Sequence, residues 1–159
     1  MSGLKPVVVD ANILFSALLR EESRFSRLIL GSERSFYICE STIVELFKHK
    51  ERILQFSKLS ESEVIRLFYL LLRHLVVVKE ELIAPETRAE AYKLCAEIDE
   101  TDTPHVALTM HLDGMFWSGD KELKEGLIDQ GFDHFFATDW LLSVAITSQR
   151  QSHSAGWVS

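Results

Sequence analysis

The sequence predicts an α/β fold with three layers, in which a central, mostly parallel five-stranded sheet lies between helices. Two observations support this class. Short runs of β-branched and aromatic residues, the first of them Val7 to Val9, alternate with stretches of helical periodicity. Strands that alternate with helices form parallel sheets covered on both faces. The length of 159 residues fits one domain with a substantial core. We therefore expect one domain over residues 1–148 and a polar tail at 149–159.

The strands are predicted from short apolar runs that end at turn or helix signals. The first run, Val7 to Val9, is β-branched and uninterrupted, as in a buried strand. The five expected strands cover residues 7–9, 36–39, 75–78, 115–118 and 132–136.

The helices are predicted from apolar periodicity and from end signals. Ser60 followed by Glu63 is a capping-box pattern. Pro85 suits a first helical turn, and Pro104 opens a further helix that should stop near Gly114. The expected helices cover residues 12–19, 42–49, 60–73, 85–97, 102–114, 121–125 and 139–149.

Composition predicts a cytoplasmic protein. Charged residues make up 26% and hydrophobic residues 47% of the chain, as in ordinary soluble domains. The two cysteines form no C-x-x-C pattern, which favours a reducing compartment. No signal-peptide pattern is expected, and the most apolar stretch, 67–78, is interrupted by Arg73 and His74 and is too short to cross a bilayer. The net charge of -7 argues against a strongly basic nucleic-acid binder but is compatible with a nuclease whose acids hold metal.

Four acidic residues stand where a strand should end or a helix should begin: Asp10, Glu45, Asp102 and Asp120. In an open α/β sheet such positions gather along one crevice outside the carboxyl ends of the strands. Clustered carboxylates remain ionised together only when a cation compensates their charge. Oxygen ligands suit Mg²⁺ or Mn²⁺, which commonly also bind phosphate groups of a substrate. The pattern therefore predicts a divalent metal site for phosphate-ester chemistry.

Each of these acids also has a simpler structural interpretation. Asp10 and Asp102 can be helix caps, and Glu45 completes a capping-box pattern with Thr42. Asp120 lies in Ser-Gly-Asp, a common turn composition. Asp99 is an alternative or additional ligand near Asp102. The spacing of the six histidines predicts no metal site, and no histidine is assigned a role.

Four blocks of the chain resemble the PIN-domain ribonucleases, a family that includes the ribonuclease toxins of toxin-antitoxin pairs. They are VVVDANILFSAL at 7–18, STIVEL at 41–46, DETDTPHVAL at 99–108 and WSGDKEL at 117–123. The blocks stand in the family's order. The resemblance implies a PIN-like α/β/α fold and an acidic pocket that binds Mg²⁺ or Mn²⁺ and cleaves RNA.

By this resemblance the catalytic positions are Asp10, Glu45, Asp102 and Asp120. Asp10, Asp102 and Asp120 would bind the metal, and Glu45 would complete its shell or help to deprotonate a water. Second-shell support is expected from Asn12, Ser118 and Asp99. The resemblance also implies an RNA substrate, an antitoxin partner and a homodimer.

Two alternatives remain at this point. Haloacid-dehalogenase-like phosphatases also place an Asp after the first strand, but they need a second Asp where Asn12 stands. Their separate hydroxyl and Gly-Asp elements are fused here in Ser118-Gly119-Asp120. The other alternative is a catalytically silent PIN-like binding module, against which the four retained acids argue.

Overall fold

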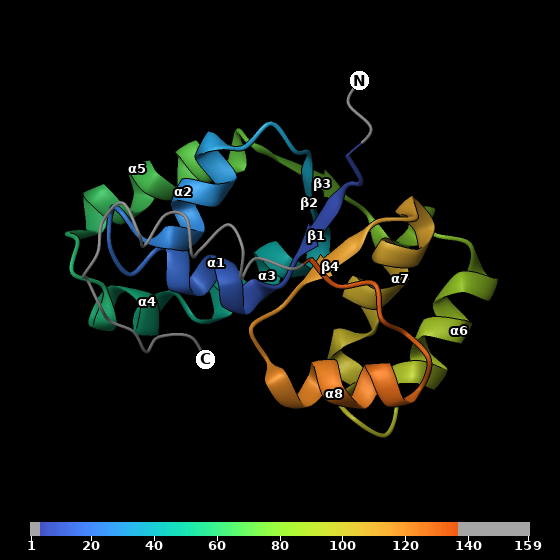
Figure 1. The fold of residues 1–159 in the computed structure, drawn as a ribbon. Helices are drawn as coiled ribbons and strands as arrows, with labels where there is room; N and C mark the ends of the chain where they lie inside the picture. Colours follow the sequence, from blue (N-terminus) through green and yellow to red (C-terminus); the bar gives the residue numbers. More distant parts are fainter. Residues whose placement is uncertain (1–3, 137–159) are drawn as a thin grey trace.

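The structure is a computed structural model that describes residues 4–136. The predicted helix at 139–149 and the predicted tail at 149–159 lie outside the described residues. Four parallel strands form the sheet (Figure 1): β1 (Val7–Val9), β2 (Phe36–Cys39), β3 (Leu75–Val78) and β4 (Met115–Trp117). The helices are α1 (Ala11–Ala17), α2 (Arg24–Gly31), α3 (Glu40–Lys48), α4 (Lys50–Phe56), α5 (Glu61–Leu72), α6 (Pro85–Cys95), α7 (Thr103–Leu112) and α8 (Lys121–Asp129). Two short 3-10 helices are η1 (Glu80–Leu82) and η2 (Glu100–Asp102).

The strand order is β3-β2-β1-β4, and every neighbouring pair is parallel. Strands β2 and then β3 follow β1 on one side. Strand β4, which comes last of the four in the sequence, pairs with the other side of β1. The order therefore reverses between β1 and β4. In open α/β sheets this switch point, outside the carboxyl ends of the strands, is where ligands bind.

The predicted fifth strand at 132–136 is wrong. This segment meets β4 through a single bridge, Phe116 to Phe135, in which Phe116 N donates to His134 O at 2.8 Å and Phe136 N donates to Phe116 O at 2.9 Å. Phe135 N instead donates back to Asp133 O at 3.1 Å. This local turn bends the chain before a ladder can extend.

Helices cover both faces of the sheet, which confirms the predicted three-layer α/β class (Figure 1). Val7 and Val9 join one apolar core with α1, α2, α3, α4 and α5, whereas Val8 faces a second core with α6, α7 and α8. This alternation is the two-residue period of a strand. All three valines have no exposed surface, because a parallel strand at the centre of such a sheet is buried on both faces.

The structure adds two helices to the predicted pattern and adjusts others. The sequence interpretation omitted α2, which Ser23 opens by accepting from Ser26 N, and α4, which follows α3 after His49. The predicted capping box at Ser60 and Glu63 is present, with both of its hydrogen bonds formed. α8 runs to Asp129 rather than 125. In the described part of the chain no helix is long and apolar enough to cross a membrane.

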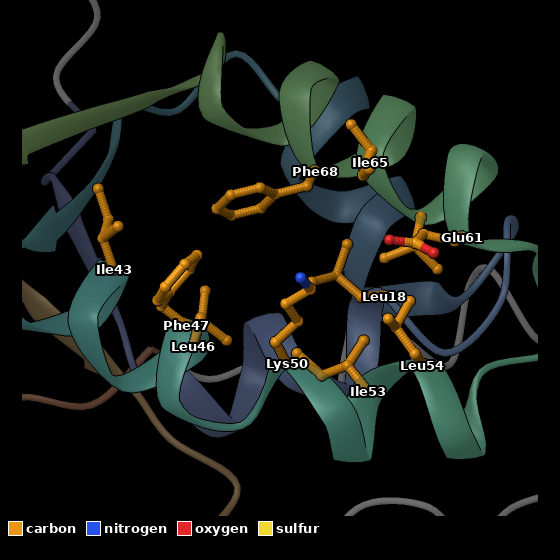
Figure 2. A pocket seen from close by; sticks show the side chains of 11 residues that line it. Leu18, Ile43, Leu46, Phe47, Lys50, Ile53, Leu54, Glu61, Ile65 and Phe68 are labelled. Atoms are coloured by element: carbon orange, nitrogen blue, oxygen red, sulfur yellow. The ribbon is translucent and has the colours of Figure 1, made fainter.

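An apolar cavity of about 260 Å³ opens between α3, α4 and α5 on the first face (Figure 2). Ile43, Leu46 and Phe47 of α3 and Phe68 of α5 point toward it. Lys50 and Glu61 are its charged lining residues. None of the predicted site residues lines this cavity, so the acidic residues and the apolar cavity are separate features.

Gly114 holds β4 close to the residue that precedes β1. A Cβ at this position would lie 2.4 Å from Pro6 O, a backbone atom that accepts from Met115 N at 2.9 Å. We expect Gly114→Ala to separate β4 from β1 and to lower the free energy of unfolding by about 1–3 kcal/mol. Chemical denaturation would measure this loss. The control is Gly31→Ala, where an added Cβ meets nothing within 4 Å; equal destabilisation by both changes would contradict the steric explanation.

Candidate metal site

Asp10 lies directly after β1 at the switch point of the sheet. Its backbone N donates to Trp117 O at 3.0 Å, which extends the pairing of β1 with β4 to this residue. The side chain is only 5% exposed. Its Oδ2 accepts from Ser118 Oγ at 2.9 Å, and its Oδ1 accepts from Asn12 N at 3.3 Å. Asp10 therefore caps α1 and faces the end of β4 at the same time.

The end of β4 supplies Ser118 and Asp120. The buried hydroxyl of Ser118 donates to Asp10 and accepts from Asp120 N at 3.1 Å. Asp120 Oδ1 accepts from Leu123 N at 3.1 Å and so caps α8. This cap uses only Oδ1 of Asp120, so the second carboxylate oxygen of Asp120 has no capping role.

Asp102 comes from a different element, because it stands at the start of α7. Asp102 is the N-cap residue of α7, as one interpretation predicted, but its side chain makes no capping hydrogen bond. Burial, together with the nearby charges of Asp10, Asp99 and Asp120, raises the pKa of Asp102 to about 8. Carboxylates from three separate elements thus lie close enough to oppose the ionisation of one another.

His105 is a site residue that the sequence interpretation missed. It is 7% exposed and stacks on Phe116, with ring centroids 5.7 Å apart. Its Nε2 lies 3.9 Å from Asp10 Oδ1, and its Nδ1 lies 4.0 Å from Cys39 Sγ. Burial lowers the pKa of His105, although the charge of Asp10 acts in the opposite direction. The ring is therefore neutral near pH 7. The spacing of three residues from Asp102 on one helix was the available signal, because such residues share a helix face.

Asp10, Asp102 and His105 together form a set of metal-ligand atoms. One ligand atom from each of the three lies within 4.8 Å of the others. Two carboxylates and a neutral imidazole are donors that divalent metals accept. The negative charges of Asp10, Asp99 and Asp120 add to burial in raising the pKa of Asp102, and a bound cation would offset these charges. The donors present fit a divalent metal ion.

Glu45 stands apart from this close group. Its side chain is 51% exposed and Oε2 lies 3.2 Å from Nε2 of His49, one turn along. The predicted capping box with Thr42 is wrong, because α3 begins at Glu40 and Cys39 is its N-cap residue. The negative charge of Glu45 nevertheless acts to raise the pKa of His105, against the lowering by burial, so Glu45 lies within electrostatic range of the site.

Asn12 and Asp99 reach the site indirectly. The side chain of Asn12 is exposed, and it is the backbone N–H of Asn12 that donates to Asp10 Oδ1. Asp99 Oδ1 accepts from both the backbone N and the hydroxyl of Thr101, at 3.0 and 2.6 Å, which stabilises η2. Its charge adds to the field that raises the pKa of Asp102.

Glu80 is a second acid that the sequence interpretation missed. It follows β3 by two residues and accepts from Ser41 N at 2.9 Å. Burial acts to raise the pKa of Glu80, but the hydrogen bonds from Ser41 outweigh it and lower the pKa. Its charge acts on both Cys39 and His105. The sequence offered a signal for Glu80, because an acid that follows a strand is the pattern that identified Asp10.

Ser118 should matter through the hydrogen bonds that orient Asp10. We expect Ser118→Ala to weaken divalent metal affinity by about tenfold or more, since outer hydrogen bonds to a metal ligand commonly contribute 10–100-fold. Isothermal titration calorimetry with Mn²⁺ would measure the change. The control is Ser62→Ala, which removes an exposed hydroxyl on α5 that contacts Ser60 and no residue of the site. Unchanged affinity in Ser118→Ala would contradict the orienting role.

Comparisons with known proteins agree with this arrangement. The family model described as PIN domain matches residues 8–135. The crystal structure of PAE2754 from Pyrobaculum aerophilum has a similar fold, with a TM-score of 0.60, 16% sequence identity and 91% of each chain covered. No curated protein matches the chain. The family match covers β2, β3, β4, all but the first residue of β1, and the acidic residues at the switch point. The chain therefore belongs to the PIN-domain family.

Proposed function

We propose that this protein is a metal-dependent endoribonuclease that hydrolyses RNA phosphodiester bonds. The observation that carries the proposal is the close set of ligand atoms from Asp10, Asp102 and His105 at the switch point of a PIN-domain sheet. Such a position is accessible to a substrate that approaches the strand ends. PIN domains belong to a nuclease superfamily, which favours phosphodiesters over other phosphate esters.

Asp10, Asp102 and Asp120 would hold Mg²⁺ or Mn²⁺. The bound ion would lower the pKa of a water and neutralise charge on the scissile phosphate. Ser118 would hold the Asp10 carboxylate in place, while Asp99 and the backbone of Asn12 would support its neighbours.

Glu45 would serve as the outer acid of the site. Its exposed carboxylate can accept a proton from an attacking water or complete the metal's shell through a water molecule. His49, which pairs with Glu45, would hold this carboxylate in position.

We also propose that the chain works in the cytoplasm with a protein partner, either an antitoxin or a second copy of itself. An unrestrained ribonuclease would harm its own cell, and large apolar side chains such as Phe47 and Ile65 are exposed. Light scattering and co-purification with the product of a neighbouring gene would test this part. A monomer that binds no such product would contradict it and leave the nuclease proposal standing.

The decisive experiment is incubation of the purified protein with structured and unstructured RNA in Mn²⁺, Mg²⁺ or a chelator. We expect RNA cleavage that requires the metal. Hydrolysis of a small phosphomonoester with intact RNA would instead indicate the phosphatase alternative. Metal binding without hydrolysis of either substrate would indicate a binding module.

A further inference from the structure

His105 places a nitrogen atom in a site whose other close donors are carboxylate oxygens. Among the described residues, the ligand atoms that lie within 4.8 Å of one another come from Asp10, Asp102 and His105. Mg²⁺ prefers a shell of oxygen ligands, whereas imidazole nitrogen suits first-row transition ions. The donor set is therefore mixed rather than all-oxygen.

The geometry selects Nε2 as the atom that faces the carboxylates. The other ring nitrogen, Nδ1, lies 4.0 Å from the buried Cys39 Sγ on the opposite side of the ring. A histidine that ligates a metal through one nitrogen commonly places the other against a second protein group. Stacking on Phe116, at an angle of 19°, also fixes the plane of the ring. The imidazole is thus held in one orientation by two neighbours that are outside the acidic group.

The separation between Nε2 and Asp10 Oδ1 is also informative. At 3.9 Å it is too long for a hydrogen bond between the two side chains. Two ligands of one ion, each bonded at about 2.1 Å, lie roughly 3–4 Å apart. The distance therefore matches two ligands of a common ion better than it matches a direct contact.

We propose that His105 is a metal ligand that makes this site prefer a first-row transition ion such as Mn²⁺ over Mg²⁺. The inference rests on the proposed function only in placing the metal beside Asp10 and Asp102, to which His105 adds a ligand. A purely packing role for His105 would require its aromatic ring against Phe116 but not its nitrogen atoms.

His105→Phe separates these two roles, because it keeps an aromatic ring for Phe116 and removes both nitrogens. We expect the variant to lose Mn²⁺ affinity by about tenfold or more while Mg²⁺ affinity changes much less, so that the ratio of the two affinities falls. His105→Gln, which places an amide near the position of Nε2, should lower the same ratio. The matched control is His111→Gln, an exposed histidine on the same helix, which should keep the wild-type ratio.

The second readout begins with the wild-type protein, where its result does not depend on how any variant folds. Pulsed electron paramagnetic resonance of bound Mn²⁺ should show coupling to a ¹⁴N nucleus, and the coupling should disappear in His105→Phe and His105→Gln. Absence of the coupling in the wild-type protein, or its persistence in both His105 variants, would overturn the proposal. So would an unchanged ratio of Mn²⁺ to Mg²⁺ affinity.

Neither measurement contains RNA, which keeps the two proposals distinguishable. Metal-dependent RNA cleavage without nitrogen coupling would reject the role of His105 and retain the nuclease. Nitrogen coupling with the expected affinity ratio, in a protein that cleaves no RNA, would support His105 and reject the nuclease.

Discussion

Asp10→Asn is expected to abolish metal-dependent RNA cleavage. The change keeps the shape of the side chain but removes a ligand charge from the centre of the site. Metal ions contribute several kcal/mol to transition states of this kind, so the rate should fall on the order of 10³-fold. Cleavage of a labelled RNA at saturating Mn²⁺ and calorimetric metal binding would measure the loss.

The thermal stability of metal-free Asp10→Asn should not fall as its activity does. Asn is as good a helix cap as Asp, and Ser118 Oγ can accept a hydrogen bond from the new amide. Because the change also relieves repulsion with Asp102 and Asp120, thermal stability without metal should stay the same or rise slightly. Asp120→Asn should give the same pattern. Wild-type metal binding in both variants would refute the assigned site.

Metal binding near pH 7 is expected to release a proton from Asp102. The folded protein without metal holds this proton up to a pKa of about 8, whereas the ion requires the ionised carboxylate. Metal affinity should therefore increase with pH up to about pH 8. Calorimetry in two buffers with different protonation enthalpies would count the released proton. Asp102→Asn should bind metal more weakly and without this release.

The carboxyl group of Asp102 should make the metal-free protein less stable as pH rises. The folded pKa of about 8 lies above the ordinary Asp value of 3.8, so the folded state binds the proton more tightly than the unfolded state. The contribution of protonated Asp102 to the free energy of unfolding is complete below the unfolded pKa of this group. It is lost as pH rises through the folded pKa. At pH 7 the metal-free Asp102→Asn variant should melt about 3 °C or more above the wild type.

The control for the Asp102 experiments is Asp113→Asn. Asp113 is exposed at the end of the same helix, and its left-handed backbone, with φ of 53°, also suits Asn. Its contact with Lys5 is a surface ion pair of 3.6 Å, which contributes little. A comparable rise in melting temperature for Asp113→Asn would assign the effect to net charge rather than to the site.

Sequence patterns predicted the parts of the fold that depend on local signals. The valine run of β1, the capping box of α5 and the proline near the start of α7 were each sufficient to place an element. The fifth strand failed for a different reason. Its aromatic residues have strand propensity, but whether they extend a ladder depends on the turn at Asp133 to Phe135, which only tertiary packing determines.

The candidate site was predictable to the extent that its residues end strands. Asp10 and Ser118 follow neighbouring strands, and the structure joins them by a hydrogen bond. His105 could not be placed by the same rule, because its direction depends on how α7 crosses the sheet near β1 and β2. Glu45 is the opposite case, a predicted residue that lies apart from the close group. It stands in a suitable motif, but its side chain is on the exposed side of its helix.

The hydrogen bond between Ser118 and Asp10 joins residues that are 108 positions apart. Pairing of distant strands is slow, because the chain must close a long loop before any contact compensates for its entropy. During synthesis the N-terminal half emerges first and contains Asp10 without Ser118, Asp102 or His105. A ribosome-bound chain therefore cannot assemble the site until β4 has emerged and paired with β1. For the ribonuclease proposed above, order of assembly alone would keep the growing chain inactive beside the messenger RNA from which it is translated.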